Sequence, residues 1–278
     1  MANPAFNSAA YVGAIKAGRQ SQVSASELKK LYNRPATAAE PDLDELYGRP
    51  AATPVETDRM SYEDTIVKTV IAFAILLAGA VVGWMVPILM IPGAIAGFVL
   101  ALVNIFKKKP SRGLILAYAA TEGLFVGGIS YVFNGMWDGI VTQAIFGTLG
   151  VVAVTLALFA SGKVRATPKM TKIFLIAMVG YAAFSLVNFG LMTFGATDDG
   201  MFGVRSVEII PGVPWGAVIG VLVVLLAAYS LVMDFEAIKA GVEAGAPRVY
   251  GWQGAFGIMV TVVWLYLEIL RLIAIFRE

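Results

Sequence analysis

Four ionisable side chains lie inside or at the border of long apolar runs, namely Glu122, Asp234, Glu268 and Arg271. A charge at the centre of a membrane helix costs about 2.5–3.5 kcal/mol on insertion scales. Acidic residues in such places usually face the interior of a helix bundle, where they pair, carry protons or bind cations. These four residues are therefore the first candidates for chemistry.

The chain contains no Cys and no His, which narrows the chemistry further. Thiol catalysis, Ser-His-Asp catalysis and Cys/His zinc sites are excluded. The Gly-x-Gly-Asp motif of intramembrane aspartyl proteases and a phosphate-binding Gly-Lys-Ser/Thr loop are also absent. We expect no enzymatic activity and no cofactor, with a calcium ion as the one candidate for a bound or permeant species.

The composition indicates a membrane protein, because 58% of the 278 residues are hydrophobic and only 14% are charged. Soluble domains carry about 25% charged residues. Apolar segments near the length of about 20 residues that crosses a bilayer follow one another from residue 61 onward. We predict an all-α polytopic protein with seven transmembrane helices, at about residues 66–86, 88–106, 113–133, 140–160, 173–194, 213–233 and 254–276. Six spans is the alternative, because only Pro87 and its neighbours separate the first two segments.

Residues 1–60 are polar and poor in large apolar side chains, so we expect a mostly disordered cytoplasmic tail without a signal peptide. Ser61 followed by Asp64 fits a capping box at the start of the membrane domain, residues 61–278. The net charge of +2 gives no reason to expect a nucleic acid as partner.

Basic residues alternate between the two sides of the predicted bundle. The connections after helices two, four and six are basic, and they contain Lys107, Lys108, Lys109, Arg112, Lys163, Arg165, Lys169, Lys172, Lys239 and Arg248. The opposite side has Arg205 beside acidic residues. The positive-inside rule then places the N-terminus in the cytoplasm, the C-terminus outside, and the chain in the cytoplasmic (plasma) membrane.

Asp234 and Glu268 are predicted to approach each other. Helices six and seven must run antiparallel, and residue 251, in the turn between them, is midway between the two acids. They reach similar depth if helix six continues beyond residue 233, through Glu236 and Lys239. Two close carboxyl groups in a low dielectric share a proton and, when ionised, attract a hard cation such as Ca²⁺.

Structural interpretations of these acids stay open. Glu268 and Arg271 are three residues apart and can form an ion pair on one helix face. Asp234 can be an interfacial carboxylate at a helix end. Glu122 can be protonated, paired with Arg271, or part of the same polar path. Glycines four residues apart favour a compact bundle, and they are Gly79/Gly83, Gly93/Gly97, Gly123/Gly127 and Gly216/Gly220.

Two segments resemble a known family, with the sequences YSLVMD at residues 229–234 and WLYLEILRL at residues 264–272. They are similar to the last two helices of the Bax inhibitor-1/YccA (transmembrane Bax inhibitor motif) family, and in particular to a bacterial branch with a long N-terminal tail. The resemblance implies a seven-helix bundle whose last helix is central and wrapped by the other six. It implies Asp234 and Glu268 as the pH sensor of a calcium leak, and Lys107 as a latch for the helix-six acid.

Three features depart from the pattern of that family. The helix-seven acid is Glu rather than Asp, the latch residue is Lys107 rather than Arg, and the spacing between the acids is longer. Lys cannot pair with a carboxylate in the planar bidentate way that Arg can.

The first functional hypothesis is a passive, pH-sensitive cation leak channel, with calcium as the expected ion. The alternative is a non-transporting membrane protein that modulates a membrane protease, a quality-control complex or a stress response through residues 1–60. A proton-coupled transporter ranks last, because the hydropathy shows no internal repeat.

Overall fold

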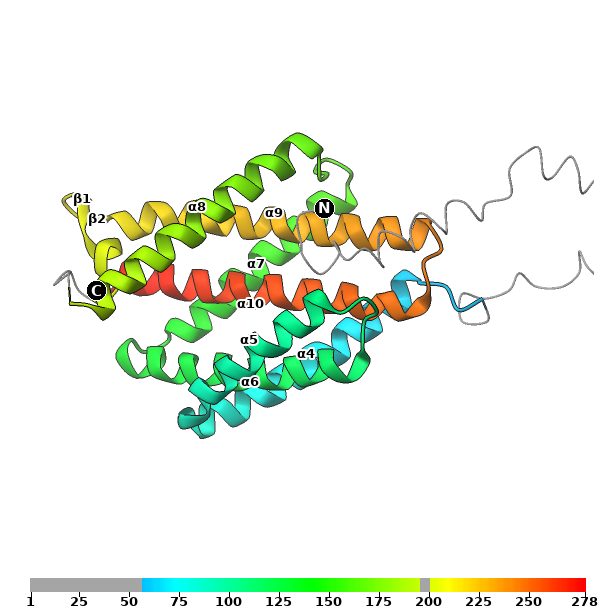
Figure 1. Ribbon diagram of the computed structural model, residues 1–278. Helices are drawn as coiled ribbons and strands as arrows, with labels where there is room; N and C mark the ends of the chain where they lie inside the picture. The colour runs from blue at the N-terminus through cyan, green and yellow to red at the C-terminus, as the bar shows by residue number, and fades with distance from the viewer. Residues whose placement is uncertain (1–56, 196–200) are drawn as a thin grey trace, which may run out of the picture.

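Seven long helices form the bulk of the computed structural model, which describes residues 57–195 and 201–278 (Figure 1). They are α4 (Tyr62–Met85), α5 (Met90–Phe106), α6 (Arg112–Met136), α7 (Ile140–Ala160), α8 (Pro168–Thr193), α9 (Trp215–Glu243) and α10 (Gly251–Ile275). Each is long and apolar enough to cross a membrane, which confirms seven spans rather than six. The predicted tail lies outside the described residues up to residue 56.

Short elements separate the helices. A single 3-10 turn, η2 (Pro87–Leu89), divides α4 from α5, because Pro87 fixes its φ angle and has no N–H to continue a helix. The α8–α9 connection contains η3 (Gly203–Ser206) and an antiparallel pair of short strands, β1 (Glu208–Ile210) and β2 (Val213–Pro214). The turn η4 (Arg248–Tyr250) leads into α10.

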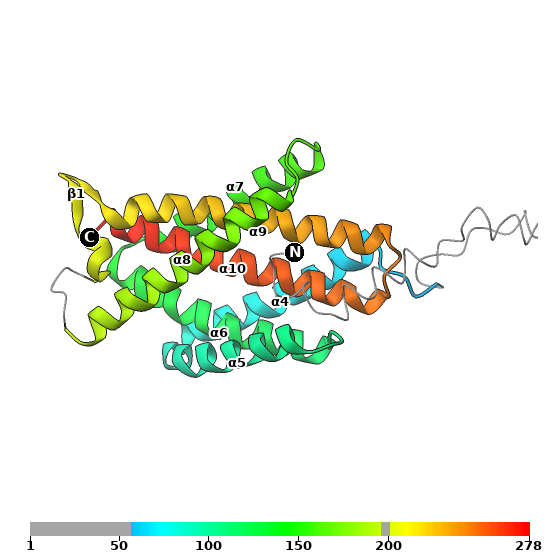
Figure 2. The same cartoon turned by 45° about the horizontal axis from the view of Figure 1, so that its top comes forward.

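Helix α10 lies in the interior of the bundle (Figure 2). It packs against α4, α6, α7 and α9, and its span has the largest buried share of the seven. Helix α5 packs mainly on the outside of α6, and α8 packs loosely on α9 and η3. The central position expected for the last helix therefore agrees with the packing.

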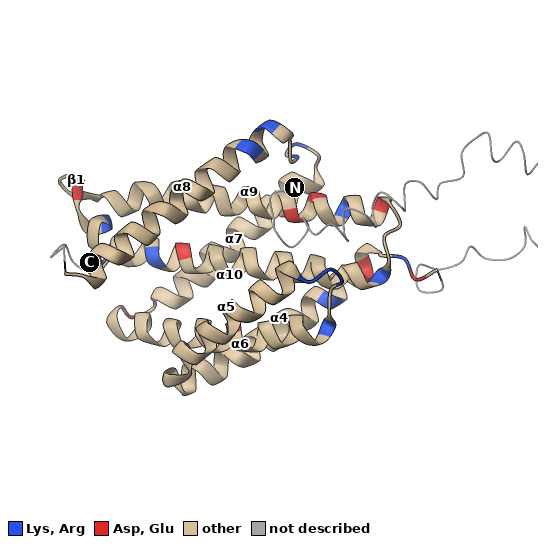
Figure 3. Cartoon of the chain, in the orientation of Figure 1, with Lys and Arg blue, Asp and Glu red and all other residues tan. Residues whose placement is uncertain are grey.

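Charged residues are scarce along the middle of the helices (Figure 3). The α5–α6, α7–α8 and α9–α10 connections lie toward the same end of the bundle (Figure 1). The basic residues counted in the sequence lie in these connections or in the helix ends beside them. The arrangement has the alternation that the positive-inside rule requires. Which side of the membrane this end faces stays a prediction.

Helices α4 and α6 approach closely through their glycines. A Cβ atom added to Gly83 would lie 2.2 Å from the carbonyl oxygen of Leu124, and one added to Gly127 would lie 1.9 Å from that of Ala80. Gly79 and Gly123 are equally confined against the opposite backbone. Small residues at this spacing let two membrane helices pack backbone to backbone.

The start of α4 is tied to the α9–α10 turn by a partly buried polar cluster. Ser61 accepts a hydrogen bond from the backbone N–H of Asp64 at 3.2 Å, as the predicted cap requires. The Asp64 carboxylate pairs with Arg248, at 2.7 Å from its NH2, and with Lys68. Lys68 is 7% exposed and also donates to the carbonyl oxygen of Arg248 at 2.6 Å. The first and last membrane helices are thereby held together at one end.

We expect Gly127→Ala to destabilise the bundle, because the new methyl group would overlap the α4 backbone at Ala80. Overpacking of this kind costs about 1–3 kcal/mol. Gly135→Ala is the matched control, since a Cβ atom at Gly135, on the same helix, meets nothing within 4 Å. Thermal unfolding in detergent should show a lower Tm for Gly127→Ala alone. Equal Tm values for both variants would contradict the close α4–α6 contact.

Candidate functional site

Asp234 has no exposed surface. Helix α9 does not end near residue 233 but continues to Glu243, so Asp234 lies within the helix. It therefore does not lie at a helix end, as the alternative interpretation assumes. A fully buried carboxyl group needs hydrogen bonds or a counter-charge to offset its lost hydration.

Two hydroxyl groups surround this carboxyl group. Thr261 Oγ1, on α10, donates a hydrogen bond to Asp234 Oδ2 at 2.6 Å. Ser230 Oγ lies one turn before Asp234 on α9 and 3.4 Å from Thr261 Oγ1. We call Ser230, Asp234 and Thr261 the Asp234 cluster. It places three polar side chains in a row inside an apolar helix interface.

Glu268 lies in a separate polar cluster, with an exposed fraction of 3%. Arg271 NH1 is 3.0 Å from its Oε1 and 3.1 Å from its Oε2, so the ion pair suggested by their spacing is present. The Tyr181 hydroxyl, on α8, donates to Oε1 at 2.5 Å, and Trp264 Nε1 donates to the same oxygen at 3.3 Å. Glu268 thus links α8 to the central helix.

Arg205 joins the same cluster from η3. Its side chain is 4% exposed, and its NH2 donates to the Tyr181 hydroxyl at 3.2 Å and to Ser185 Oγ at 2.9 Å. Its guanidinium also lies over the rings of Tyr181 and Phe184 at 5.3 Å. We call Tyr181, Arg205, Glu268 and Arg271 the Tyr181 cluster.

Sequence reasoning missed Arg205 and Tyr181 as site residues. From the sequence, Arg205 is expected in a connection outside the membrane, and Tyr181 lies within the apolar segment 173–194. The one available signal was that Arg205 is the single basic residue of its connection. Nothing in the sequence indicates that its side chain turns back into the bundle.

The two acids lie on neighbouring helices but at different levels. Thr261, the α10 residue beside Asp234, precedes Glu268 by two helical turns, or about 10 Å of helix rise. The hairpin is centred near Pro247 and Arg248, midway between Asp234 and Thr261, rather than at residue 251. Each carboxyl group therefore has its own partners. This register does not support a proton that the two groups share directly.

The other predicted pairing residues lie apart from these clusters. Arg271 bonds to Glu268 and Tyr181, whereas Glu122 Oε2 lies against Gly97 of α5, where an added Cβ atom would be 2.7 Å away. Lys107 is exposed at the end of α5, while Asp234 is enclosed. Lys107 forms no hydrogen bond or ion pair with any described residue, so the proposed latch is not closed here.

The two predicted calcium ligands, Asp234 and Glu268, lie in different polar clusters. Within residues 57–195 and 201–278, no three Asp or Glu side chains gather closely enough to hold a metal ion. Ca²⁺ takes six to eight oxygen ligands. The Asp234 cluster offers one carboxylate and two hydroxyl groups, so backbone oxygens or water would have to complete a calcium shell.

Comparison with known proteins identifies the family. The family model described as Bax inhibitor 1 like matches residues 3–278, which is nearly the whole chain. No curated protein and no solved structure matches the chain. The seven-helix bundle, with its most buried helix at the C-terminal end, is what the resemblance of the last two helices implied. This integral membrane protein belongs to the Bax inhibitor 1 like family.

Proposed function

We propose that this protein is a passive, pH-sensitive cation leak, with calcium as the expected ion and Asp234 as the group that attracts it. The observation that carries the proposal is the complete burial of Asp234 beside the hydroxyl groups of Thr261 and Ser230. An ionisable residue inside a membrane bundle commonly marks an ion pathway.

The carboxyl group makes such a leak sensitive to pH. Ionised Asp234 attracts a cation. Two opposite unit charges in close contact attract each other by several kcal/mol, even at an effective dielectric of about 20. A proton on the carboxyl group removes this attraction. Protons and cations therefore compete for Asp234, and flux should fall as the pH is lowered.

In this proposal, the Tyr181 cluster closes one end of the cation path. Two guanidinium groups, from Arg205 and Arg271, flank a single carboxylate, Glu268. Their net positive charge opposes the entry of a cation. Opening would require Glu268 to lose its bonds to Arg271 and Tyr181.

We expect Asp234→Asn to lower calcium flux into proteoliposomes roughly tenfold or more, since it removes one buried charge. The remaining flux should lack the increase with pH that the ionisation of Asp234 gives the wild type. Glu236→Gln is the matched control, because Glu236 lies on the same helix with a side chain that is 33% exposed. Glu268→Gln should alter opening by releasing Arg271.

Wild-type flux and pH dependence in Asp234→Asn would contradict the proposal. An absence of flux at any pH in the wild-type protein would instead favour the interaction protein, whose predicted binding segment is residues 1–60.

A second prediction concerns the hydrogen bond from Thr261. A donor to a carboxylate stabilises its ionised form, so Thr261→Val should move the pH-dependent rise of flux to higher pH. A bond to a charged group is worth about 1.5–3 kcal/mol, which corresponds to a shift of about 1–2 pH units. Thr148→Val is the control, because that buried hydroxyl bonds only within its own helix, to the carbonyl oxygen of Ala144. If Thr261→Val leaves the dependence of flux on pH unchanged, Asp234 does not set the pH response.

A further inference from the structure

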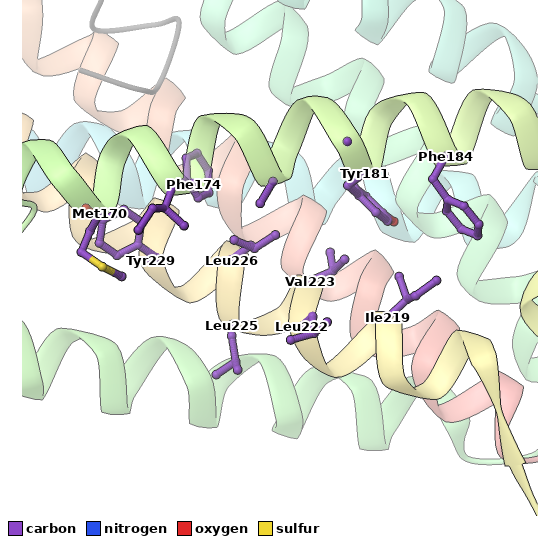
Figure 4. Close-up of a pocket in the computed structure, with 13 residues that line it drawn as sticks. Met170, Phe174, Tyr181, Phe184, Ile219, Leu222, Val223, Leu225, Leu226 and Tyr229 are labelled. Carbon is purple, nitrogen blue, oxygen red and sulfur yellow. The ribbon is translucent and has the colours of Figure 1, made fainter. Parts of the chain in front are cut away.

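An apolar groove separates α8 from α9 (Figure 4). Its volume is about 480 Å³, and its lining is almost entirely hydrophobic, from residues that include Phe174, Ala177, Gly180, Leu222 and Leu226. Helix α8 has the smallest buried share of the seven spans, so the groove opens on a face that the bilayer must cover.

A second cavity adjoins this groove at Tyr181, which lines both. We call it the polar cavity because its wall contains charged groups as well as apolar side chains. Its volume is about 420 Å³, and Ser185, Arg205, Glu268 and Arg271 contribute to its wall. The charged groups of the wall are two guanidinium groups and one carboxylate. The cavity therefore has a net charge of about +1, and it adjoins the long apolar groove.

Both guanidinium groups have unused donors. Arg205 bonds to its neighbours through NH2 alone, and Arg271 through NH1 alone. Within residues 57–195 and 201–278, their other nitrogen atoms form no hydrogen bond. A guanidinium carries five N–H donors, and its planar geometry suits the oxygens of a phosphate. Arg205 is 96% buried and lines the cavity, so its unused donors are available to a ligand bound there.

The groove also has the length of a lipid chain. Its lining on α8 runs from Met170 to Phe184, which is about 21 Å of helix rise. This exceeds half the thickness of a hydrocarbon core of about 30 Å. The polar cavity lies toward the end of the bundle where α8 ends and α9 begins, within reach of one membrane interface for side chains as long as Arg.

We propose that this site binds one anionic phospholipid, with its phosphate at Arg205 and Arg271 and one acyl chain between α8 and α9. The polar cavity alone could accept a free phosphate ion, and the groove alone could accept any lipid. The two together select a molecule that has both an anionic headgroup and a long apolar chain. This binding does not depend on cation flux.

The test is lipid retention after solubilisation from vesicles of equal phosphatidylglycerol and phosphatidylcholine with the same acyl chains. Native mass spectrometry of the full chain measures the lipid that stays bound. We expect phosphatidylglycerol to be retained about fivefold over phosphatidylcholine, the factor for one net positive charge near a membrane surface. Arg205→Gln should abolish this preference, and Arg205→Lys should keep part of it. If Arg205→Gln does not fold, Arg271→Gln, at a side chain that is 33% exposed, should also weaken the preference for phosphatidylglycerol.

The apolar half of the site has its own variant. Gly180→Leu places a side chain in the groove, where a Cβ atom meets nothing within 4 Å, and should reduce retention of both lipids. Gly190→Leu, on the same helix but outside the groove lining, is the control and should retain lipid as the wild type does. Equal retention of the two lipids by the wild type would overturn the proposal. So would competition by inorganic phosphate with no effect of Gly180→Leu, which would indicate a site for small anions only.

Discussion

The buried hydrogen bond between Thr261 and Asp234 is the constraint on which the rest of the bundle depends. A carboxyl group without exposed surface in a membrane helix must find its partners inside the protein. Helix α9 must therefore continue past Asp234, and α10 must present Thr261 at the same level. The α9–α10 turn fixes this register, and the contacts of Asp64 with Arg248 and Lys68 fasten α4 to the same turn.

The helices divide into a tightly packed part and a loosely attached one. Helices α4 and α6 meet through glycines with their backbones in contact, which leaves little freedom to move. Helix α8, in contrast, is attached largely by polar side chains. At its middle, the Tyr181 hydroxyl donates to Glu268 and accepts from Arg271 and Arg205. Helix α8 is therefore the element that the proposed pH response and the proposed lipid site share.

The sequence predicted the architecture but not the register of the site. Apolar runs of helical length gave seven spans, and the local spacing of Ser61 with Asp64 and of Glu268 with Arg271 gave contacts that are present. Depth across the α9–α10 hairpin could not be obtained in this way, because it depends on where the chain reverses. Gly245 at a φ of +63° and the turn η4 place this reversal earlier than residue 251. The inward direction of the Arg205 side chain likewise depends on Tyr181 and Ser185, which are distant in sequence.

Disulfide trapping tests the register most directly, because the chain has no cysteine of its own. Ser230→Cys paired with Thr261→Cys should cross-link in membranes under mild oxidation, because the hydroxyl oxygens that the cysteine sulfurs would replace face each other at 3.4 Å. Ser230→Cys paired with Glu268→Cys, two turns further along α10, should not. Cross-linking of the second pair but not the first would show that Glu268 lies beside Asp234, and would contradict the separation of the two polar clusters.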